Sequence, residues 1–102
     1  MRVQVLFGRV LRRLRDDYGM SQAMVAKRGE FDRSYIANLE AGKAHPSLGT
    51  FMRLAAALGL DPVVLMEELF KEIAADPDYE REHRRVLRGR REPQGDTPDD
   101  TQ

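Results

Sequence analysis

Apolar residues recur along most of this chain at the spacing that turns one side of a helix toward a core. The first run predicts a helix from about Gln4 to Asp17, with apolar residues at i, i+3, i+4, i+7 and i+11. That stripe consists of Phe7, Val10, Leu11, Leu14 and Tyr18. Gly19 follows it and is expected to end the helix.

Short polar residues mark where three further helices begin. Ser21 is placed to cap a second helix, and Asp32 to cap a third, which Gly42 stops after about residue 41. Ser47 is placed to cap a fourth helix, which ends at Gly59. We expect the fourth helix to turn the following side chains inward: Leu48, Phe51, Leu54, Ala55 and Leu58.

Two Asp-Pro pairs predict a fifth and a sixth helix, because proline is favoured at the first helical position. Asp61-Pro62 opens the fifth helix, whose apolar face is formed by Leu65, Met66, Leu69, Phe70 and Ile73. Asp76-Pro77 opens the sixth, over about residues 77–87, whose many charges make it marginal in isolation. From Arg88 onward the chain has no apolar residues, which predicts a disordered C-terminal tail.

The chain is therefore expected to be all-α, with one domain over residues 1–75 and a charged extension over residues 76–102. Its 102 residues are enough for one core. The absence of cysteine excludes disulfides and thiolate metal sites. No apolar run approaches the ~20 residues of a membrane helix, and the apolar start is too short for a signal peptide. We expect a cytoplasmic protein.

Residues 21–41 have the layout of a helix-turn-helix motif, whose second helix lies in the major groove of DNA. Ile36 and Leu39 supply the apolar side of that second helix. Its exposed side is expected to carry groups that hydrogen-bond base edges: Arg33, Ser34 and Asn38. The segment predicts sequence-specific binding of double-stranded DNA.

Four short motifs extend beyond the two helices: Gly19-Met20-Ser21-Gln22, Leu39-Glu40-Ala41-Gly42-Lys43, Pro46-Ser47-Leu48 and Ala57-Leu58-Gly59. With these motifs, in this order and spacing, the chain from about Phe7 to Met66 resembles the lambda-repressor/Cro class of domains, the XRE family. The resemblance implies a five-helix DNA-binding domain, which the sixth helix and the tail would follow here.

The resemblance also implies roles for single residues. Gln22, at the start of the second helix, is expected to bond a DNA phosphate, which a helix N-terminus also favours. Lys43 matches a loop that follows the phosphate backbone. Arg33 is expected to contact guanine, with phosphate or solvent as the alternatives, and Asn38 to contact adenine. With Ser34, these residues form the expected DNA-binding set.

Two further expectations concern the position of the third helix. Arg15 and Glu40 match a family pair that joins the first helix to the end of the third, so we expect a partly buried bidentate ion pair. Glu30 stands where the family usually has a glycine with positive φ, a conformation that costs other residues about 1 kcal/mol. Either Glu30 tolerates this conformation or the turn is rebuilt around Gly29.

The formal net charge of the whole chain is zero, but its two parts differ in sign. Residues 1–66 hold ten basic and six acidic residues, a net charge of +4. Residues 67–102 hold seven basic and eleven acidic residues, a net charge of −4. A basic domain followed by an acidic tail is expected when one end meets phosphate, although charge runs are also common on solvated faces.

The sequence therefore predicts a small transcriptional regulator that binds duplex DNA as a homodimer, without cofactor or metal. The dimer is expected because the fifth helix carries more apolar surface than a small domain usually leaves uncovered; the alternative is that the sixth helix covers it. The alternative function is a protein–protein adaptor or antitoxin that binds a partner protein through the fifth helix and the C-terminal region. An enzyme is not expected, because the chain has no G-x-S-x-G motif or P-loop, and His45 and His83 lack metal-ligand spacing.

Overall fold

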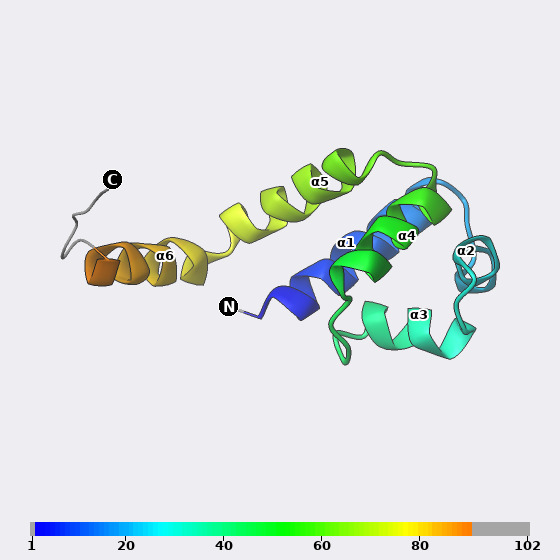
Figure 1. The fold of residues 1–102 in the computed structure, drawn as a ribbon, viewed down its shortest axis with the longest axis horizontal. Coiled ribbons are helices and arrows are strands. Elements are labelled where there is room, and N and C mark those ends of the chain that lie inside the picture. Colours follow the sequence, from blue (N-terminus) through cyan, green and yellow to red (C-terminus); the bar gives the residue numbers. More distant parts are fainter. Residues whose placement is uncertain (1, 91–102) are drawn as a thin grey trace, which may run out of the picture. The chain divides into compact units, whose positions relative to one another are not determined.

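The computed structural model describes residues 2–90, and all its regular elements in that range are α-helices. The six helices are α1 (Val3–Asp17), α2 (Gln22–Gly29), α3 (Arg33–Glu40), α4 (Leu48–Leu58), α5 (Pro62–Ala75) and α6 (Pro77–Arg90) (Figure 1). This confirms the all-α prediction. The prediction that disorder begins at Arg88 is wrong for residues 88–90, which continue α6. Residues 91–102, the rest of the expected tail, lie outside the described residues.

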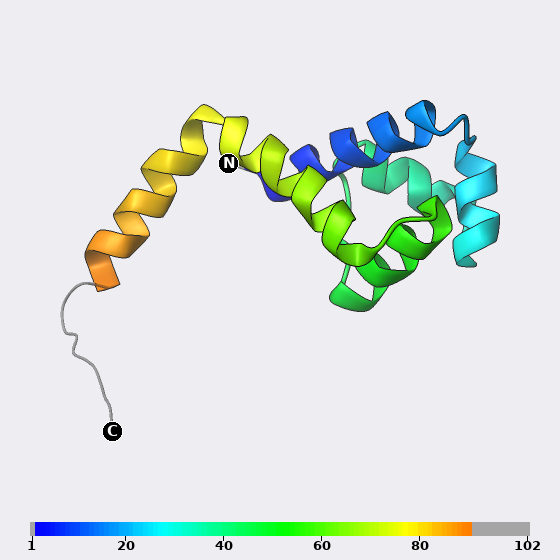
Figure 2. The same cartoon turned by 90° about the horizontal axis from the view of Figure 1, so that it is seen from above.

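The chain divides into two compact units, one from Arg2 to Ile73 and one that begins at Ala74. In the first unit, α3 packs on both α1 and α2, and α2 also packs on α4. In Figure 1, α5 lies above α1 and α4 and α3 lies below them. Figure 2, seen from above, shows α5 in front and the fainter α3 behind. The surface of α3 that points away from α1 is therefore not covered by α5.

Side-chain caps begin most of these helices where the sequence predicts them. The side-chain oxygens of Ser21, Ser47, Asp61 and Asp76 each accept a backbone N–H two or three residues later, at 2.8–3.0 Å. Asp32 occupies the N-cap position of α3 with an extended backbone, but its side chain makes no capping hydrogen bond. The prediction for Asp32 is therefore right in position and wrong in mechanism.

One apolar core joins α1 to α5 within the first unit. Its fully enclosed side chains are Phe7, Val10, Leu11, Val25, Ile36, Leu39, Leu54 and Leu65. Two expected core residues lie outside it, because Leu48 is 83% exposed and Tyr18 is 45% exposed. Leu48 is the first residue of α4, and helical side chains tilt toward the N-terminus, so it points past the end of the helix. Tyr18 already leaves the helical path as the C-cap of α1.

Within residues 2–90, no single helix is long and apolar enough to cross a bilayer. Only α4 and α5 taken together have the length and composition of a span, and the chain bends by 104° between them.

Candidate nucleic-acid interface

The α2–turn–α3 segment separates a buried side from an exposed side. Ile36 and Leu39 are fully buried and fix one side of α3 in the core. Arg33, Ser34 and Asn38 are exposed on the other side, as the sequence predicts. The structure thus brings these three polar side chains together on one surface of a single helix.

The two other members of the expected DNA-binding set lie at the edges of this surface. Gln22 is the first residue of α2 and is half-buried, whereas Lys43 is exposed just after α3. The Lys43 N–H donates to the Asn38 carbonyl at 2.9 Å, which holds the start of the loop against the end of α3. Their contacts with phosphate stay predictions.

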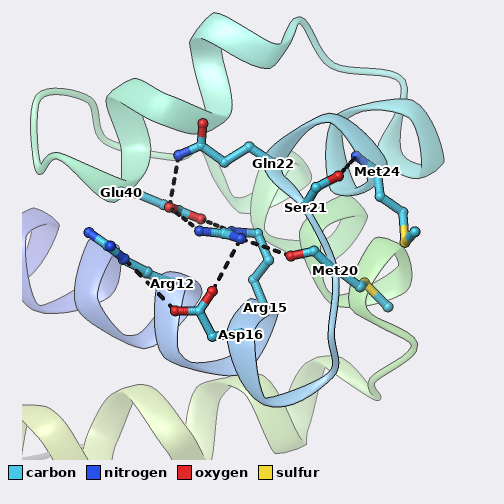
Figure 3. Close-up of polar contacts among 8 residues, drawn as sticks. All are labelled: Arg12, Arg15, Asp16, Met20, Ser21, Gln22, Met24 and Glu40. Atoms are coloured by element: carbon cyan, nitrogen blue, oxygen red, sulfur yellow. Dashed lines mark hydrogen bonds and ion pairs between the residues drawn. The ribbon is translucent and has the colours of Figure 1, made fainter.

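The Glu40 carboxylate, at the end of α3, joins all three helices of this region (Figure 3). Arg15, from α1, donates from Nε to Glu40 Oε2 at 2.6 Å and from Nη2 to Glu40 Oε1 at 3.0 Å. Gln22 donates from Nε2 to Glu40 Oε1 at 3.0 Å. A primary amide has a second N–H, so Gln22 keeps a donor for another acceptor. The predicted bidentate pair between Arg15 and Glu40 is confirmed.

The surroundings of Arg15 make this ion pair different from those on the surface. The side chain of Arg15 is 12% exposed and that of Glu40 is 5% exposed. Arg15 Nη1 also donates to the Met20 carbonyl at 2.8 Å and lies 3.3 Å from Asp16 Oδ1. The hydrogen bond to Glu40, opposed by desolvation, raises the pKa of Arg15. Arg15 is therefore a fixed cation that ties the end of α3 to α1.

Gly8 allows α1 and α3 to approach each other closely at the same end of α3. A β-carbon at this position would lie 2.5 Å from the Leu39 carbonyl oxygen and 2.7 Å from that of Glu40. Such distances are too short for any side chain, so only glycine fits. This role of Gly8 was not predicted, although an isolated glycine inside an apolar helical stripe is the expected sign of close packing.

The turn between α2 and α3 keeps the form expected of the family although it lacks the usual glycine. Glu30 adopts a left-handed conformation, with φ 60° and ψ 48°, and follows Gly29, the last residue of α2. A β-carbon on Gly29 would lie 2.5 Å from the ring of Phe31. Of the two alternatives, the first is confirmed: Glu30 tolerates the conformation, and Gly29 serves packing.

Arg53, from α4, binds the turn from outside and was not singled out by sequence reasoning. Its Nη2 donates to the carbonyl oxygens of Gly29 and Glu30, at 2.7 and 2.8 Å. Its guanidinium carbon lies 4.3 Å from the ring centre of Phe31, a cation–π contact. The carbonyls at a helix end lack partners within the helix, so Arg53 stabilises this end of α2 from another element.

Substitution of Glu30 by glycine is expected to raise the free energy of unfolding by about 1 kcal/mol, because glycine adopts the left-handed conformation without strain. Glu30→Ala is the matched control, since it removes the same carboxylate but keeps the β-carbon. Urea denaturation of the three proteins measures the difference. Equal stabilisation by both substitutions would show that the carboxylate, and not the backbone conformation, is the source.

Two other polar side chains of this region, Tyr35 and His45, differ in their surroundings. Tyr35 is half-buried, with its ring centre 5.7 Å from that of Phe31, so it packs beside the turn. His45 is exposed and borders a shallow groove lined by Val3, Phe7 and Met66. Among residues 2–90, no group of three or more histidine, cysteine or acidic side chains is arranged to hold a metal ion.

A family model described as a helix-turn-helix domain matches residues 6–69, which contain α2, the turn and α3. The chain belongs to this helix-turn-helix family. The lambda-repressor-like fold implied by the sequence motifs is confirmed by the same match and by solved structures.

Three proteins illustrate the similarity of this helix-turn-helix chain to known ones. An uncharacterized HTH-type transcriptional regulator of Sinorhizobium fredii is 36% identical over 66 residues, which cover 65% of this chain and 86% of the relative. The restriction-modification controller protein C.AhdI of Aeromonas hydrophila is 40% identical, with a TM-score of 0.59 over 61% of this chain and 94% of that one. The controller protein C.Esp1396I, solved as a tetramer with its natural operator, is 25% identical, with a TM-score of 0.67 over 71% of this chain and 95% of that one.

Proposed function

We propose that this chain is a transcriptional regulator that binds duplex DNA with α3 in the major groove. The observation that carries the proposal is the exposed polar side of α3, formed by Arg33, Ser34 and Asn38, on a helix whose other side is fixed in the core. Membership of the helix-turn-helix family and similarity to a controller protein solved with its operator support the same role. The proposal assigns the chain no enzymatic activity and locates it in the cytoplasm.

The side chains divide into two kinds of contact. Arg33 presents a planar pair of donors that fits guanine O6 and N7. Asn38 presents an amide that pairs with adenine, and Ser34 presents a hydroxyl that can hydrogen-bond more than one kind of base edge. Gln22 and Lys43 lie at the edges of the surface, where phosphates pass and set the register of the protein on the duplex. The second amide N–H of Gln22 is the donor that would meet phosphate while Glu40 holds the first.

The regulator is proposed to act as a homodimer. Apolar side chains stay exposed on the start of α4 and on α5, where Leu48 is 83%, Met52 53%, Val63 64% and Met66 46% exposed. Leu48 and Met66 line one groove, which would be buried between two copies. A symmetric dimer would present two copies of α3 about one DNA turn apart to a near-palindrome. Analytical ultracentrifugation that finds only monomer, at high concentration and on DNA, would reject the dimer.

Binding to a pool of random duplexes, followed by a salt titration on the selected sequence, tests the proposed function. If each half-site engages roughly three to five phosphates, the logarithm of the association constant should fall steeply and linearly with the logarithm of salt concentration. Failure to bind any duplex at low salt, or a flat salt profile, would reject the regulator. That outcome would favour the alternative, an adaptor that binds a partner protein through α5 and the C-terminal region.

Removal of a base contact and removal of a phosphate contact should have different signatures. Arg33→Ala is expected to cost about 1–3 kcal/mol on the selected sequence and to relax the preference at one base position. Lys43→Ala should weaken selected and random DNA alike and reduce the salt slope by about one unit. Gel shifts with both duplexes measure the two effects. An equal loss on all sequences for Arg33→Ala would make Arg33 a phosphate contact instead.

A further inference from the structure

The C-terminal helix α6 lies beyond the part of the chain that the family accounts for. The family match ends at residue 69, whereas α6 spans Pro77–Arg90. The match to C.AhdI covers 94% of that protein but only 61% of this chain, so more than a third of this chain has no counterpart in it. Whatever α6 does is therefore an addition to the shared DNA-binding unit.

Charges of opposite sign are separated along α6. Its acidic residues, Asp78, Glu80 and Glu82, all lie in the first half. From Arg84 to Arg90 the helix has four arginines and no acidic residue. Residues 67–102 therefore contain a strongly basic segment, residues 84–90, although their net charge is negative. A favourable interaction with the helix dipole is limited to the last turn, so it does not explain Arg84 and Arg85.

The arginines of α6 exceed the acidic partners available to them. Arg81 forms an ion pair with Asp78, and Arg84 forms one with Glu80 at 3.3 Å. Arg85 and Arg88 have no ion pair within the part of the chain that the structure describes. Arg85 also lies four residues after Arg81 and three before Arg88, spacings at which like charges repel on a helix. A polyanion placed beside this surface would relieve that repulsion.

The arrangement of side chains around α6 concentrates this charge. Arg81, Arg84 and Arg88 line one shallow depression together with Pro77 and Glu80, and their spacing of three and four residues places the arginines on one side of the helix. Tyr79, His83 and Val86 line a separate, mostly apolar depression, where the Tyr79 and His83 rings stack at 5.3 Å. The helix is thus amphipathic, with a basic side and an apolar side.

We propose that the basic surface of α6, formed by Arg84, Arg85 and Arg88, is a second DNA-binding surface that takes the phosphate backbone beside the sequence contacted by α3. This inference rests on the proposed function, since it extends the same DNA complex. Duplex DNA is the occupant that fits, because arginines are always charged and each phosphate they neutralise releases counterions. A helix of 14 residues is about 21 Å long, enough to follow several phosphates of one strand. Its contacts carry no sequence preference.

The test compares two pairs of substitutions that remove the same charge from the full-length chain. Arg85→Gln/Arg88→Gln removes two arginines of α6 that form no ion pair with any described residue, and glutamine preserves helix propensity. Arg13→Gln/Lys71→Gln is the matched control, because both cations lie around Glu68 on α5, at 3.2 and 3.1 Å from its carboxylate oxygens. The probes are the selected duplex and a random-sequence duplex of equal length, each titrated with salt. Circular dichroism checks that both variants keep the helix content of the parent.

The double substitution in α6 is expected to reduce the slope of log K against log[salt] by about two units and to weaken binding to both duplexes by the same factor. The control substitution should leave that slope unchanged. An unchanged slope for the α6 pair, or an equal change for both pairs, would overturn the inference while the parent still binds DNA. If the parent binds no duplex, the proposed function itself fails. Binding of the parent to vesicles of anionic lipid, lost in the α6 pair while its DNA slope is unchanged, would instead assign the basic helix to a membrane surface.

Discussion

Replacement of Glu40 by alanine is expected to lower the free energy of unfolding by about 3 kcal/mol, because it leaves a largely buried guanidinium without its carboxylate. Arg15, whose side chain is 12% exposed, would keep only the Met20 carbonyl and the solvent-exposed Asp16. Gln22 would lose the acceptor of its amide as well. The loss should therefore exceed that of an ordinary surface pair.

A double-mutant cycle separates the coupling between Arg15 and Glu40 from the cost of each single change. We expect the double substitution Arg15→Met/Glu40→Leu to cost much less than the sum of the single ones, since apolar replacement of a buried pair is often neutral. Lys71→Ala is the comparison, because its pair with Glu68 is exposed and worth under about 1 kcal/mol. Additive single effects in urea denaturation would show that the pair contributes no coupling.

A double-mutant cycle at neutral pH is measured with Arg15 fully charged. The hydrogen bond from Arg15 to Glu40 raises the pKa of Arg15 above its ordinary value. A raised pKa in the folded state means that the stabilisation from Arg15 is complete below the unfolded pKa and disappears only as the pH rises through the folded one. Both values lie far above neutrality for arginine, so the cycle at neutral pH records the full contribution of Arg15.

Substitution of Gly8 by alanine is expected to cost about 2–3 kcal/mol of stability, because its β-carbon would meet backbone atoms that cannot rotate away. The Leu39 and Glu40 carbonyl oxygens lie 2.5 and 2.7 Å from the position of that β-carbon. Relief requires α1 to move away from the end of α3. We therefore also expect reduced preference for the selected DNA sequence, with weaker effects on random DNA.

Gly49→Ala is the matched control for Gly8. The nearest atom to a β-carbon at Gly49 is the Ser47 hydroxyl oxygen, at 3.9 Å, so nothing obstructs it. Alanine within a helix is favoured over glycine by roughly 0.5–1 kcal/mol, which predicts slight stabilisation at Gly49. If both variants unfolded at the same urea concentration as the parent, the prediction that Gly8 is required for the close approach of α1 and α3 would be wrong.

The sequence predicted those parts of the fold that depend on local chemistry. Serine, aspartate, proline and glycine act on the backbone within a few residues, so the starts of α2, α4, α5 and α6 and the ends of α1, α3 and α4 follow from the sequence. The motifs also predicted a left-handed turn here, but they left open whether Glu30 adopts it or the turn is rebuilt around Gly29, and the structure shows Glu30 in that conformation.

The features missed by the sequence analysis depend on neighbours that are distant along the chain. Helical periodicity shows which side of α4 is apolar but not where the covering helices end, so Leu48 was wrongly placed in the core. Gly8 contacts the end of α3, 31 or 32 positions further along the chain. Arg53 binds the turn between α2 and α3, 23 or 24 positions before it. Neither contact has a local sequence pattern that specifies its partner.

The separation between the two sides of α3 has a consequence for how such regulators diversify. Arg33, Ser34 and Asn38 are exposed, and their side chains make no hydrogen bond or ion pair within residues 2–90. Substitutions at exposed positions of this kind usually change stability by no more than about 0.5 kcal/mol. Ile36, Leu39 and Glu40 meanwhile hold the helix in place from the other side. In the proposed DNA complex, a duplicated gene would therefore acquire a new operator by changes at these three positions, without compensating changes elsewhere in the domain.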